Sequence, residues 1–256
     1  MSRFGFIGVG DLALYTIRGV RHGGYRETIL LSPRNRDKAA WLAEQHGCEV
    51  QESNQAVVDN SDCVIIATRP GDCLQTLGEL DFRPGQLLIS VVAGVEIAAL
   101  REVLPGHLEI ARAMPVSSAE VGASPTLVYP DNATVRAFFD YCGNALPVDD
   151  EASFTQGSVL ACVYCWFFSL FDTLIRANTG DDLPHPLDAQ LVMGMARGAA
   201  ELALARSDTP PGDIARAIAT DGTYSKLGLD HLLQRDAFTP WNEACQLLRQ
   251  RLSADN

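Results

Sequence analysis

Short apolar runs rich in β-branched residues alternate with stretches of helical periodicity through the first half of the chain. The strand-like runs are Phe4–Gly8, Thr28–Ser32, Cys63–Ala67, Leu87–Val92, Ile110–Met114 and Thr126–Tyr129. Helix-like stretches lie between them, among them Leu12–His22, Arg36–His46 and Ile97–Val103. Alternation of this kind predicts βαβ units joined into a mostly parallel sheet.

The pattern changes after about Asp149, because no further strand-like run follows. The helical stretches in this half are Glu151–Arg176, Pro186–Arg206, Gly212–Ala219, Lys226–Gln234 and Trp241–Leu252. The sequence therefore predicts an α/β fold in two domains. Residues 1–150 form the domain with the mostly parallel sheet, and residues 151–256 form an all-helical domain.

One segment of the helical half, Val159–Phe171, is apolar at almost every position. It is shorter than the roughly 20 residues that a membrane-spanning helix needs. A helix that is apolar on every side is expected to be buried, either inside the protein or at a subunit interface. Cys162 and Cys165 lie in this segment, and we expect them to be buried thiols rather than a redox or metal pair.

Composition and charge narrow the classes of partner. The formal net charge is −12, and no cluster of Lys or Arg interrupts it, so nucleic acid is not expected to bind. No membrane partner is expected either. Seven cysteines at irregular spacings favour reduced thiols and a cytoplasmic protein, and the strand-like run at Phe4 leaves no room for a signal peptide before it.

A Gly-Val-Gly-Asp-Leu-Ala segment that starts at Gly8 follows a predicted strand and opens a predicted helix. Gly8 permits a tight turn, and Gly10 lets the backbone approach a pyrophosphate. Ala13 keeps the helix close to the strand, and the helix N-terminus attracts the diphosphate. The segment therefore predicts a dinucleotide-binding Rossmann domain, with Gly8, Gly10, Asp11 and Leu12 at the cofactor. A purely structural glycine turn is the alternative.

The end of the second predicted strand indicates which dinucleotide is bound. NAD-selective sites place Asp or Glu there, whereas an Arg accommodates the extra phosphate of NADP. Here Ser32, Arg34 and Asn35 occupy the turn, and the first acid is Asp37. Arg34 can make charge-assisted, bidentate contacts with a phosphate, so NADP(H) is favoured over NAD(H). A solvated basic turn is the alternative.

Several motifs resemble those of the pyrroline-5-carboxylate reductases, and the resemblance runs nearly end to end. The opening Gly-Phe-Ile-Gly-Val-Gly matches, as do the Ser-x-Arg-Asn turn at Ser32 and the residue Asn54. The further matches are Thr68-Arg69-Pro70, Ala93-Gly94-Val95, Arg112-Ala113-Met114-Pro115 and, in the helical half, Gly198-Ala199-Ala200. The Arg-Ala-Met-Pro run is the most specific of them.

The resemblance implies an NAD(P)H-dependent enzyme that reduces the C=N bond of pyrroline-5-carboxylate, or of a related cyclic imine, in proline biosynthesis. It implies that Asn54 lies near the adenosine and that the helical domain forms a homodimer. The residues that it places along the ribose and the nicotinamide are Thr68, Arg69, Pro70, Ala93, Gly94, Met114 and Pro115.

The sequence departs from the family at the predicted substrate end. Family Asn-Thr-Pro-Ala is Val-Ser-Ser-Ala here, Ser-Gly-Ser-Gly-Pro-Ala-Tyr keeps only its outer Ser and Tyr, and Pro-Gly-Gly-Thr-Thr is Asp-Gly-Thr-Tyr-Ser. The candidate substrate-contacting residues in these segments are Ser117, Ser158, Tyr164, Thr223, Tyr224 and Ser225. Asp221 would repel a substrate carboxylate, and our hypothesis is that it pairs with a cationic amine or iminium.

Two other functions remain open. The chain can be a non-catalytic NADP-binding sensor that kept the cofactor turn while its substrate loops changed. It can also be an alcohol or keto-acid dehydrogenase, for which Lys226 is the candidate proton donor. No metal site is expected, and the five histidines lie in separate segments.

Overall fold

The computed structural model describes residues 2–179 and 185–254, and it divides into two compact units. The first unit comprises Met1–Ala161 with Arg249–Asn256, and the second comprises Cys162–Leu248. The first unit therefore extends past residue 150 into the long helix that follows. Each unit is described by itself.

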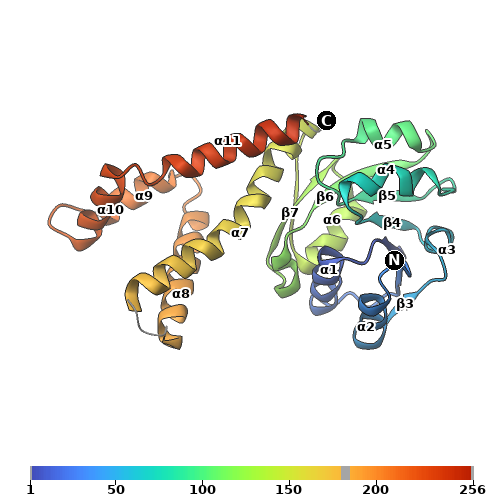
Figure 1. Ribbon diagram of the computed structural model, residues 1–256, viewed down its shortest axis with the longest axis horizontal. Helices are drawn as coiled ribbons and strands as arrows, with labels where there is room; N and C mark the ends of the chain where they lie inside the picture. Colours follow the sequence, from blue (N-terminus) through green and yellow to red (C-terminus); the bar gives the residue numbers. More distant parts are fainter. Residues whose placement is uncertain (1, 180–184, 255–256) are drawn as a thin grey trace. The chain divides into compact units, whose positions relative to one another are not determined.

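The first unit is built on an eight-stranded sheet with the order β3-β2-β1-β4-β5-β6-β7-β8 (Figure 1). Its strands are β1 (Phe4–Ile7), β2 (Ile29–Leu31), β3 (Cys48–Val50), β4 (Cys63–Ile66), β5 (Leu87–Ser90), β6 (Glu109–Met114), β7 (Ser124–Tyr129) and β8 (Gly143–Pro147). The first six strands are parallel, whereas β7 is antiparallel to β6 and parallel to β8. The order 3-2-1-4-5-6 is that of a Rossmann sheet, so the predicted fold class is confirmed.

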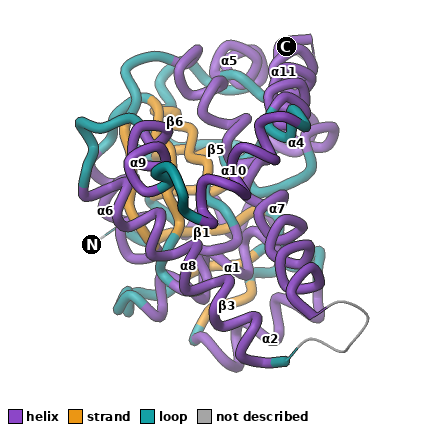
Figure 2. Tube along the Cα trace, turned by 90° about the vertical axis from the view of Figure 1, so that its left-hand side faces the viewer, coloured by secondary structure: helices purple, strands orange, loops and turns teal. Residues whose placement is uncertain are grey.

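Helices cover both faces of this sheet, as Figures 1 and 2 show. The helices of the first unit are α1 (Asp11–His22), α2 (Arg36–His46), α3 (Asn54–Asn60), α4 (Pro70–Gly78), α5 (Ile97–Val103) and α6 (Ala133–Phe139), with 3-10 turns η1 (Ser117–Val121) and η2 (Asp140–Cys142). Side chains alternate along β1, so that Phe4 and Phe6 pack on the α1, α2 and α6 side while Ile7 packs on the α3, α4 and α5 side. Two apolar clusters therefore sandwich the sheet.

Two strands lie outside the predicted pattern, and each has a sequence reason. β3 is only Cys-Glu-Val, and two of its three residues are exposed. β8 begins at Gly143 and ends at Pro147, residue types that are rare in strands. Both lie at the edges of the sheet, where burial on two faces is not required and the apolar signal is weak.

Helices are the only regular secondary structure among the described residues of the second unit. This unit holds most of α7 (Glu151–Thr179) and of α11 (Thr239–Ala254), together with α8 (Pro186–Ala205), α9 (Pro211–Ile218) and α10 (Tyr224–Gln234). Each of these helices overlaps a predicted one, with ends that differ by a few residues. Trp166 on α7 and Trp241 on α11 meet edge to face, with ring centres 5.9 Å apart.

Much of the apolar part of α7 is exposed in the single chain, so its predicted burial at a subunit interface stays a prediction. Cys162 and Cys165 are exposed, as is Phe168, at 54%. By length and composition α7 is also long enough and apolar enough to cross a membrane, which is weak support for a membrane span when a chain has one such helix. The exposed apolar surface of α7 therefore needs a partner that covers it.

Candidate functional site

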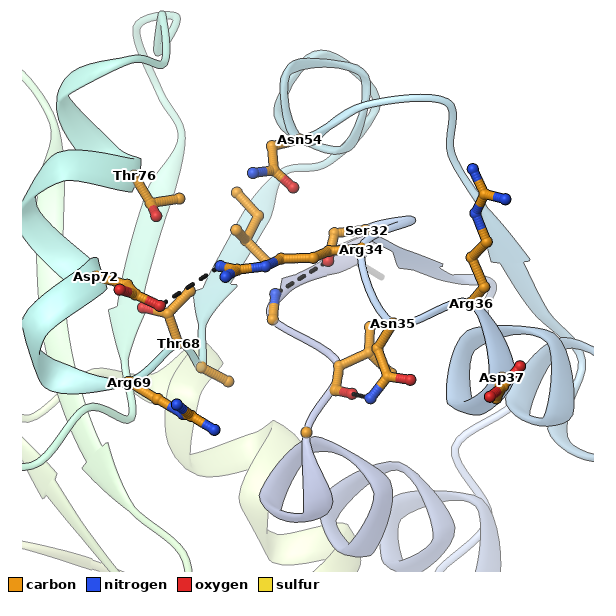
Figure 3. A pocket seen from close by; sticks show the side chains of 15 residues that line it. Ser32, Arg34, Asn35, Arg36, Asp37, Asn54, Thr68, Arg69, Asp72 and Thr76 are labelled. Atoms are coloured by element: carbon orange, nitrogen blue, oxygen red, sulfur yellow. Dashed lines mark hydrogen bonds and ion pairs between the residues drawn. The ribbon is translucent and has the colours of Figure 1, made fainter.

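A cavity of about 700 Å³ lies at the carboxyl ends of β1, β2 and β4 (Figure 3). This is the end of a parallel sheet at which α/β proteins bind their ligands. The residues that line it are Ile7, Gly8, Val9, Gly10, Ser32, Arg34, Asn35, Arg36, Asp37, Asn54, Ala67, Thr68, Arg69, Asp72 and Thr76.

The glycine turn forms one wall of the cavity. Gly8 has φ +96°, and a Cβ there would lie 2.6 Å from the carbonyl oxygen of Ala67, so only glycine fits between β1 and β4. A Cβ on Gly10 would meet no atom within 4 Å, so this glycine keeps the approach to the backbone open. Helix α1 begins directly after it, at Asp11, and its first amides face the cavity end of the sheet. The turn therefore fits a diphosphate.

Ser32 and Asn35 hold this turn in place from the end of β2. The amide of Gly8 donates to Ser32 Oγ at 3.0 Å, and Asn35 Nδ2 donates to the carbonyl oxygen of Val9 at 2.9 Å. Ser32 is buried at 1% exposure. Asn35 also caps α2, because its side chain accepts from the amide of Lys38. Both residues line the cavity as predicted, but their side-chain bonds fix the shape of the turn.

The side chain of Arg34 extends across the cavity towards α4. Its side chain is 80% exposed, and Nη1 lies 3.5 Å from Oδ2 of Asp72, in the first turn of α4. Figure 3 shows the guanidinium extended towards Asp72 over the floor of the cavity. A pair this long and this exposed is weak, so the guanidinium is available to a phosphate.

The carboxylate at the start of α1 has its own partner. Asp11 would face an anionic diphosphate from the first turn of the helix, but Lys38 Nζ lies 2.6 Å from its Oδ1. The ion pair cancels the charge on Asp11, because opposite charges this close nearly offset each other at the distance of a ligand. The Asp11 side chain is therefore held by Lys38 on α2, and Asp11 is not among the residues that line the cavity.

The structure brings together some of the predicted cofactor residues and leaves others elsewhere. Those that line the cavity are Gly8, Gly10, Ser32, Arg34, Asn35, Asn54, Thr68 and Arg69. Those outside its lining are Asp11, Leu12, Pro70, Ala93, Gly94, Met114 and Pro115. Ala93 and Gly94 lie between β5 and α5, and Met114 ends β6. These three therefore follow the neighbouring strands of the sheet.

Some lining residues were not singled out from the sequence. Asp72 and Thr76 lie on α4, one turn apart, and only the folding of α4 beside β4 directs them to the cavity. Arg36 and Asp37 begin α2, and their place next to Arg34 in the sequence was the available signal.

The predicted substrate-contacting residues are divided between the two units. In the first unit, Ser158 is 6% exposed, and its hydroxyl donates to the carbonyl oxygen of Phe154 at 2.9 Å inside α7. Ser117 begins η1. In the second unit, Tyr164 packs edge to face with Phe168, with ring centres 5.3 Å apart.

The other three candidates share the start of α10. Thr223 is its N-cap, since the hydroxyl accepts from the amide of Lys226 at 3.2 Å. Tyr224 is 93% exposed, and Ser225 follows it. Asp221 is also exposed, and its Oδ1 lies 3.9 Å from Lys226 Nζ. The structure therefore gives Thr223 the role of a helix cap.

Other chemistry has little support among the described residues. They hold no group of three or more His, Cys, Asp or Glu side chains that fits a metal ion. Burial raises the pKa of the Cys48, Cys63 and Cys73 thiols to about 11, and that of Cys142 to about 12. Thiols with such pKa values are poor nucleophiles at neutral pH.

Comparison with known proteins gives a consistent result. Residues 3–94 match the family described as NADP oxidoreductase, coenzyme F420-dependent. The pyrroline-5-carboxylate reductase of Mycobacterium leprae is 27% identical over 223 residues, which cover 81% of this chain and 76% of that protein. The 1-pyrroline-5-carboxylate reductase of Streptococcus pyogenes has the same fold, with a TM-score of 0.87 at 22% identity over 99% of this chain and 98% of the other.

A second solved structure, the pyrroline carboxylate reductase of Plasmodium falciparum with NADP bound, has a TM-score of 0.86 at 19% identity. It covers 99% of this chain and 98% of that one. The resemblance inferred from the sequence motifs is therefore confirmed.

Proposed function

Because the chain is a relative of the pyrroline-5-carboxylate reductases in sequence and in fold, we propose that it is an NADPH-dependent oxidoreductase that reduces a cyclic imine. Pyrroline-5-carboxylate, which gives proline, is the first substrate to test. The observation that carries the proposal is the cavity where the glycine turn, the start of α1 and Arg34 converge. These are the groups that a dinucleotide with a 2′-phosphate requires.

Bound NADPH supplies the hydride in such a reaction. The chain itself has to hold the cofactor and orient the imine, and the imine reacts best in its protonated form. In our proposal the turn from Gly8 to Gly10 brings the first amides of α1 to the diphosphate, and Arg34 holds the 2′-phosphate. Asn54 lies near the adenosine, and Thr68 and Arg69 lie along the ribose.

The proposed preference for NADPH over NADH rests on the end of β2. Arg34 follows this strand. The two residues beside it that bond to the glycine turn, Ser32 and Asn35, are neutral. A carboxylate that would accept the ribose hydroxyls of NAD is missing from this turn. Asp72, which reaches the cavity from α4, is already close to Arg34.

The experiment is a titration followed by turnover. NADPH and NADH are titrated onto the purified protein, and NADPH absorbance is then followed with pyrroline-5-carboxylate and with cyclic imines that lack the carboxylate. We expect NADPH to bind more tightly than NADH and to be oxidised with at least one imine. Equal binding of the two dinucleotides would contradict the NADP preference.

A non-catalytic NADP-binding sensor is the second candidate, favoured by the altered loop before α10. Asp221 and Tyr224 are both exposed there, where the resemblance places the family's proline and threonine. Tight NADPH binding without oxidation by any imine in the panel would select the sensor. Oxidation only with imines that lack a carboxylate would support the proposed pairing of Asp221 with a cationic substrate.

We also propose that the protein is a cytoplasmic homodimer that associates through its helical unit. The support is the exposed apolar surface of that unit, which includes Met195 at 71% and Leu204 at 76% on α8. No side chain of α8 is buried in the single chain. A second copy would cover this surface as well as the exposed part of α7.

A further inference from the structure

Arg112 on β6 is buried and forms an ion pair with the partly exposed Glu151, and neither residue lines the cofactor cavity. The Arg112 side chain is 2% exposed, and Nη1 lies 2.8 Å from Oε1 of Glu151. The guanidinium carbon lies 4.5 Å from the centre of the Phe154 ring, and Nε is buried without a hydrogen-bond partner. Burying a guanidinium is costly, and an apolar pair of similar size is often as stable. The pair therefore calls for a reason other than stability.

Glu151 connects three elements through one oxygen atom. Besides the guanidinium, Oε1 accepts a hydrogen bond from the amide of Ile97 at 2.9 Å, and Ile97 is the first residue of α5. Glu151 is not needed to start its own helix, because Asp150 Oδ1 already accepts from the amide of Ser153 at 2.6 Å. Its carboxylate instead ties β6 to the starts of α5 and α7.

This arrangement holds both ends of the loop between β5 and α5. At one end, Ser90 is paired with Arg112 in the β5–β6 ladder. At the other end, Ile97 is bonded to Glu151. The loop between them contains Ala93 and Gly94, and Gly94 has φ +72°. The position of the Ala93-Gly94 turn therefore depends on the distance between β6 and the Glu151 carboxylate.

The same first turns of α7 also pack against β7, the neighbour of β6 in the sheet. A Cβ on Gly157 would collide with Cδ1 of Leu127 on β7, so the helix lies close to that strand. Leu127 pairs with Met114 in the β6–β7 ladder. Arg112 and Met114 share a face of β6, because they are two residues apart in a strand. Met114 is thus fixed both along its own strand and across the ladder.

We propose that Glu151, through Arg112, is a positioning residue for the nicotinamide end of the cofactor. The two segments it fixes, Ala93-Gly94 and Met114-Pro115, are those proposed to lie along the nicotinamide, so this inference rests on the proposed function. Glu151 touches neither cofactor nor substrate in this scheme. It acts by setting the backbone against which the nicotinamide ring is placed for hydride transfer.

The test is Glu151→Gln, which keeps the size of the side chain and an oxygen acceptor. The matched control is Glu102→Gln, an exposed glutamate on α5. We expect Glu151→Gln to lower kcat roughly 10- to 100-fold, because misplacement of a reacting group by about 1 Å costs that much. The affinity for adenosine 2′,5′-bisphosphate, which lacks the nicotinamide, should stay at the wild-type value. The isotope effect on kcat with NADPH deuterated at the transferred position should rise, because hydride transfer becomes slower.

Other outcomes decide against the proposal or against the function. A wild-type kcat and isotope effect in Glu151→Gln would overturn the positioning role. A joint loss of adenosine 2′,5′-bisphosphate binding and of thermal stability in Glu151→Gln would also overturn it, because it would show a general structural role. Arg112→Lys, which keeps the charge, should have a smaller effect of the same kind. If no imine oxidises NADPH with the wild type, the proposed function fails, and the fluorescence anisotropy of bound NADPH then tests the positioning alone, with a lower value expected in Glu151→Gln.

Discussion

At the scale of single residues, the specificity of the proposed cofactor site depends on Arg34. It is the guanidinium that extends over the cavity from the end of β2, and it is mostly exposed. A charge-assisted, bidentate contact to a phosphate is worth more than a neutral hydrogen bond. The contribution of Arg34 should therefore be separable from that of the glycine turn, which binds the part common to both dinucleotides.

The first prediction concerns Arg34→Gln. Removal of a charge-assisted pair costs about 1.5–3 kcal/mol, so the Kd for NADPH should rise about 10- to 100-fold, while the Kd for NADH stays unchanged. Fluorescence titration with both dinucleotides measures this. The control is Arg206→Gln, which changes an exposed arginine that does not line the cavity. Equal weakening of NADPH and NADH would assign Arg34 to the diphosphate instead.

The second prediction concerns Asp72, which competes with the 2′-phosphate for the same guanidinium. Its Oδ2 lies 3.5 Å from Arg34 Nη1, and its negative charge would also face a bound phosphate. Asp72→Asn should therefore tighten NADPH binding, by a few-fold because exposed pairs are worth about 0.2–1 kcal/mol, and leave NADH binding unchanged. The gain should disappear at high salt and in the Arg34→Gln background. Weaker NADPH binding in Asp72→Asn would show that Asp72 instead contacts the cofactor.

At the scale of elements, the packing of α1 is set by a glycine that the sequence motif does not include. A Cβ on Gly19 would collide with the carbonyl oxygen of Ala119 in η1. Arg18, next to it, forms an ion pair with Glu120 in the same turn. The phosphate turn at the start of α1 therefore depends on close backbone contact at the other end of the helix.

The third prediction follows from this contact. Gly19→Ala should lower the free energy of unfolding by about 1–3 kcal/mol, because overpacking a tight contact costs that much. Gly71→Ala, on α4, places its Cβ where no atom lies within 4 Å, and it should leave stability unchanged or raise it by up to about 1 kcal/mol. Chemical denaturation of both variants measures the difference. Similar stabilities would show that η1 moves to accept the extra carbon.

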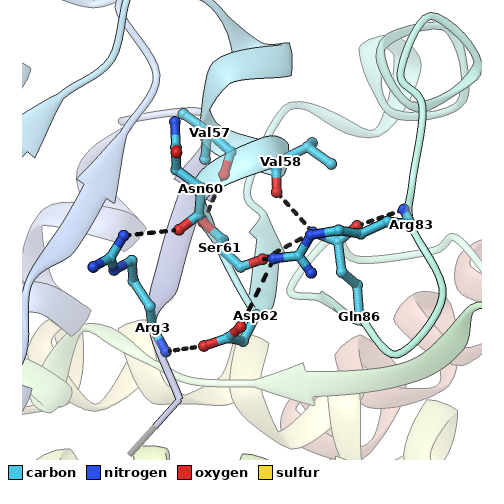
Figure 4. A network of polar contacts seen from close by, with 8 residues as sticks. All are labelled: Arg3, Val57, Val58, Asn60, Ser61, Asp62, Arg83 and Gln86. Atoms are coloured by element: carbon cyan, nitrogen blue, oxygen red, sulfur yellow. Dashed lines mark hydrogen bonds and ion pairs between the residues drawn. The ribbon is translucent and has the colours of Figure 1, made fainter.

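A polar network at the end of α3, away from the proposed cofactor site, provides hydrogen bonds to backbone carbonyl oxygens of the helix end. Gln86 is 1% exposed, and its Nε2 donates to the carbonyl oxygens of Val58 at 2.7 Å and Ser61 at 2.8 Å. Arg83 donates to the Ser61 carbonyl oxygen as well. Figure 4 shows these side chains converging on the last turn of α3. They satisfy carbonyls that a helix end leaves unpaired, which gives the network a structural role.

At the scale of the whole molecule, the exposed apolar surface of the helical unit requires a partner. Large apolar side chains are exposed on several helices of this unit, among them Phe168 on α7, Met195 on α8 and Leu227 on α10, and large exposed apolar patches mark interaction sites. The ion pair between Arg176 and Asp172, at 2.9 Å, lies near the end of α7 and would be costly to place in a bilayer. A second copy of the chain is therefore the proposed partner.

The fourth prediction tests that proposal. Met195→Glu, at a position 71% exposed on α8, should convert a dimer into a monomer, because a carboxylate buried at an apolar interface is unpaired. Val121→Glu, at a position 70% exposed in the first unit, is the matched control and should leave the dimer intact. Light scattering coupled to size-exclusion chromatography gives the mass of each. A monomeric wild type would contradict the proposal.

The sequence by itself determined the architecture of the first half and the place of the cofactor turn. Alternating apolar runs identified the buried strands, because a strand covered by helices on both faces must be apolar throughout. Gly8 and Gly10 identified the turn, because few residues other than glycine fit the backbone of Gly8 and because Gly10 leaves the approach to the backbone open. The edge strands β3 and β8 were not predicted, because burial does not constrain their composition in the same way.

Only the tertiary structure decided which side chains share the cavity and which hold the backbone around it. Asp72 reaches Arg34 from a different helix, Lys38 neutralises Asp11, and Glu151 joins β6 to α5. These pairs are separated along the chain, so no local pattern of residues encodes them. They arise because the sheet brings the ends of its strands and the starts of their helices to one edge.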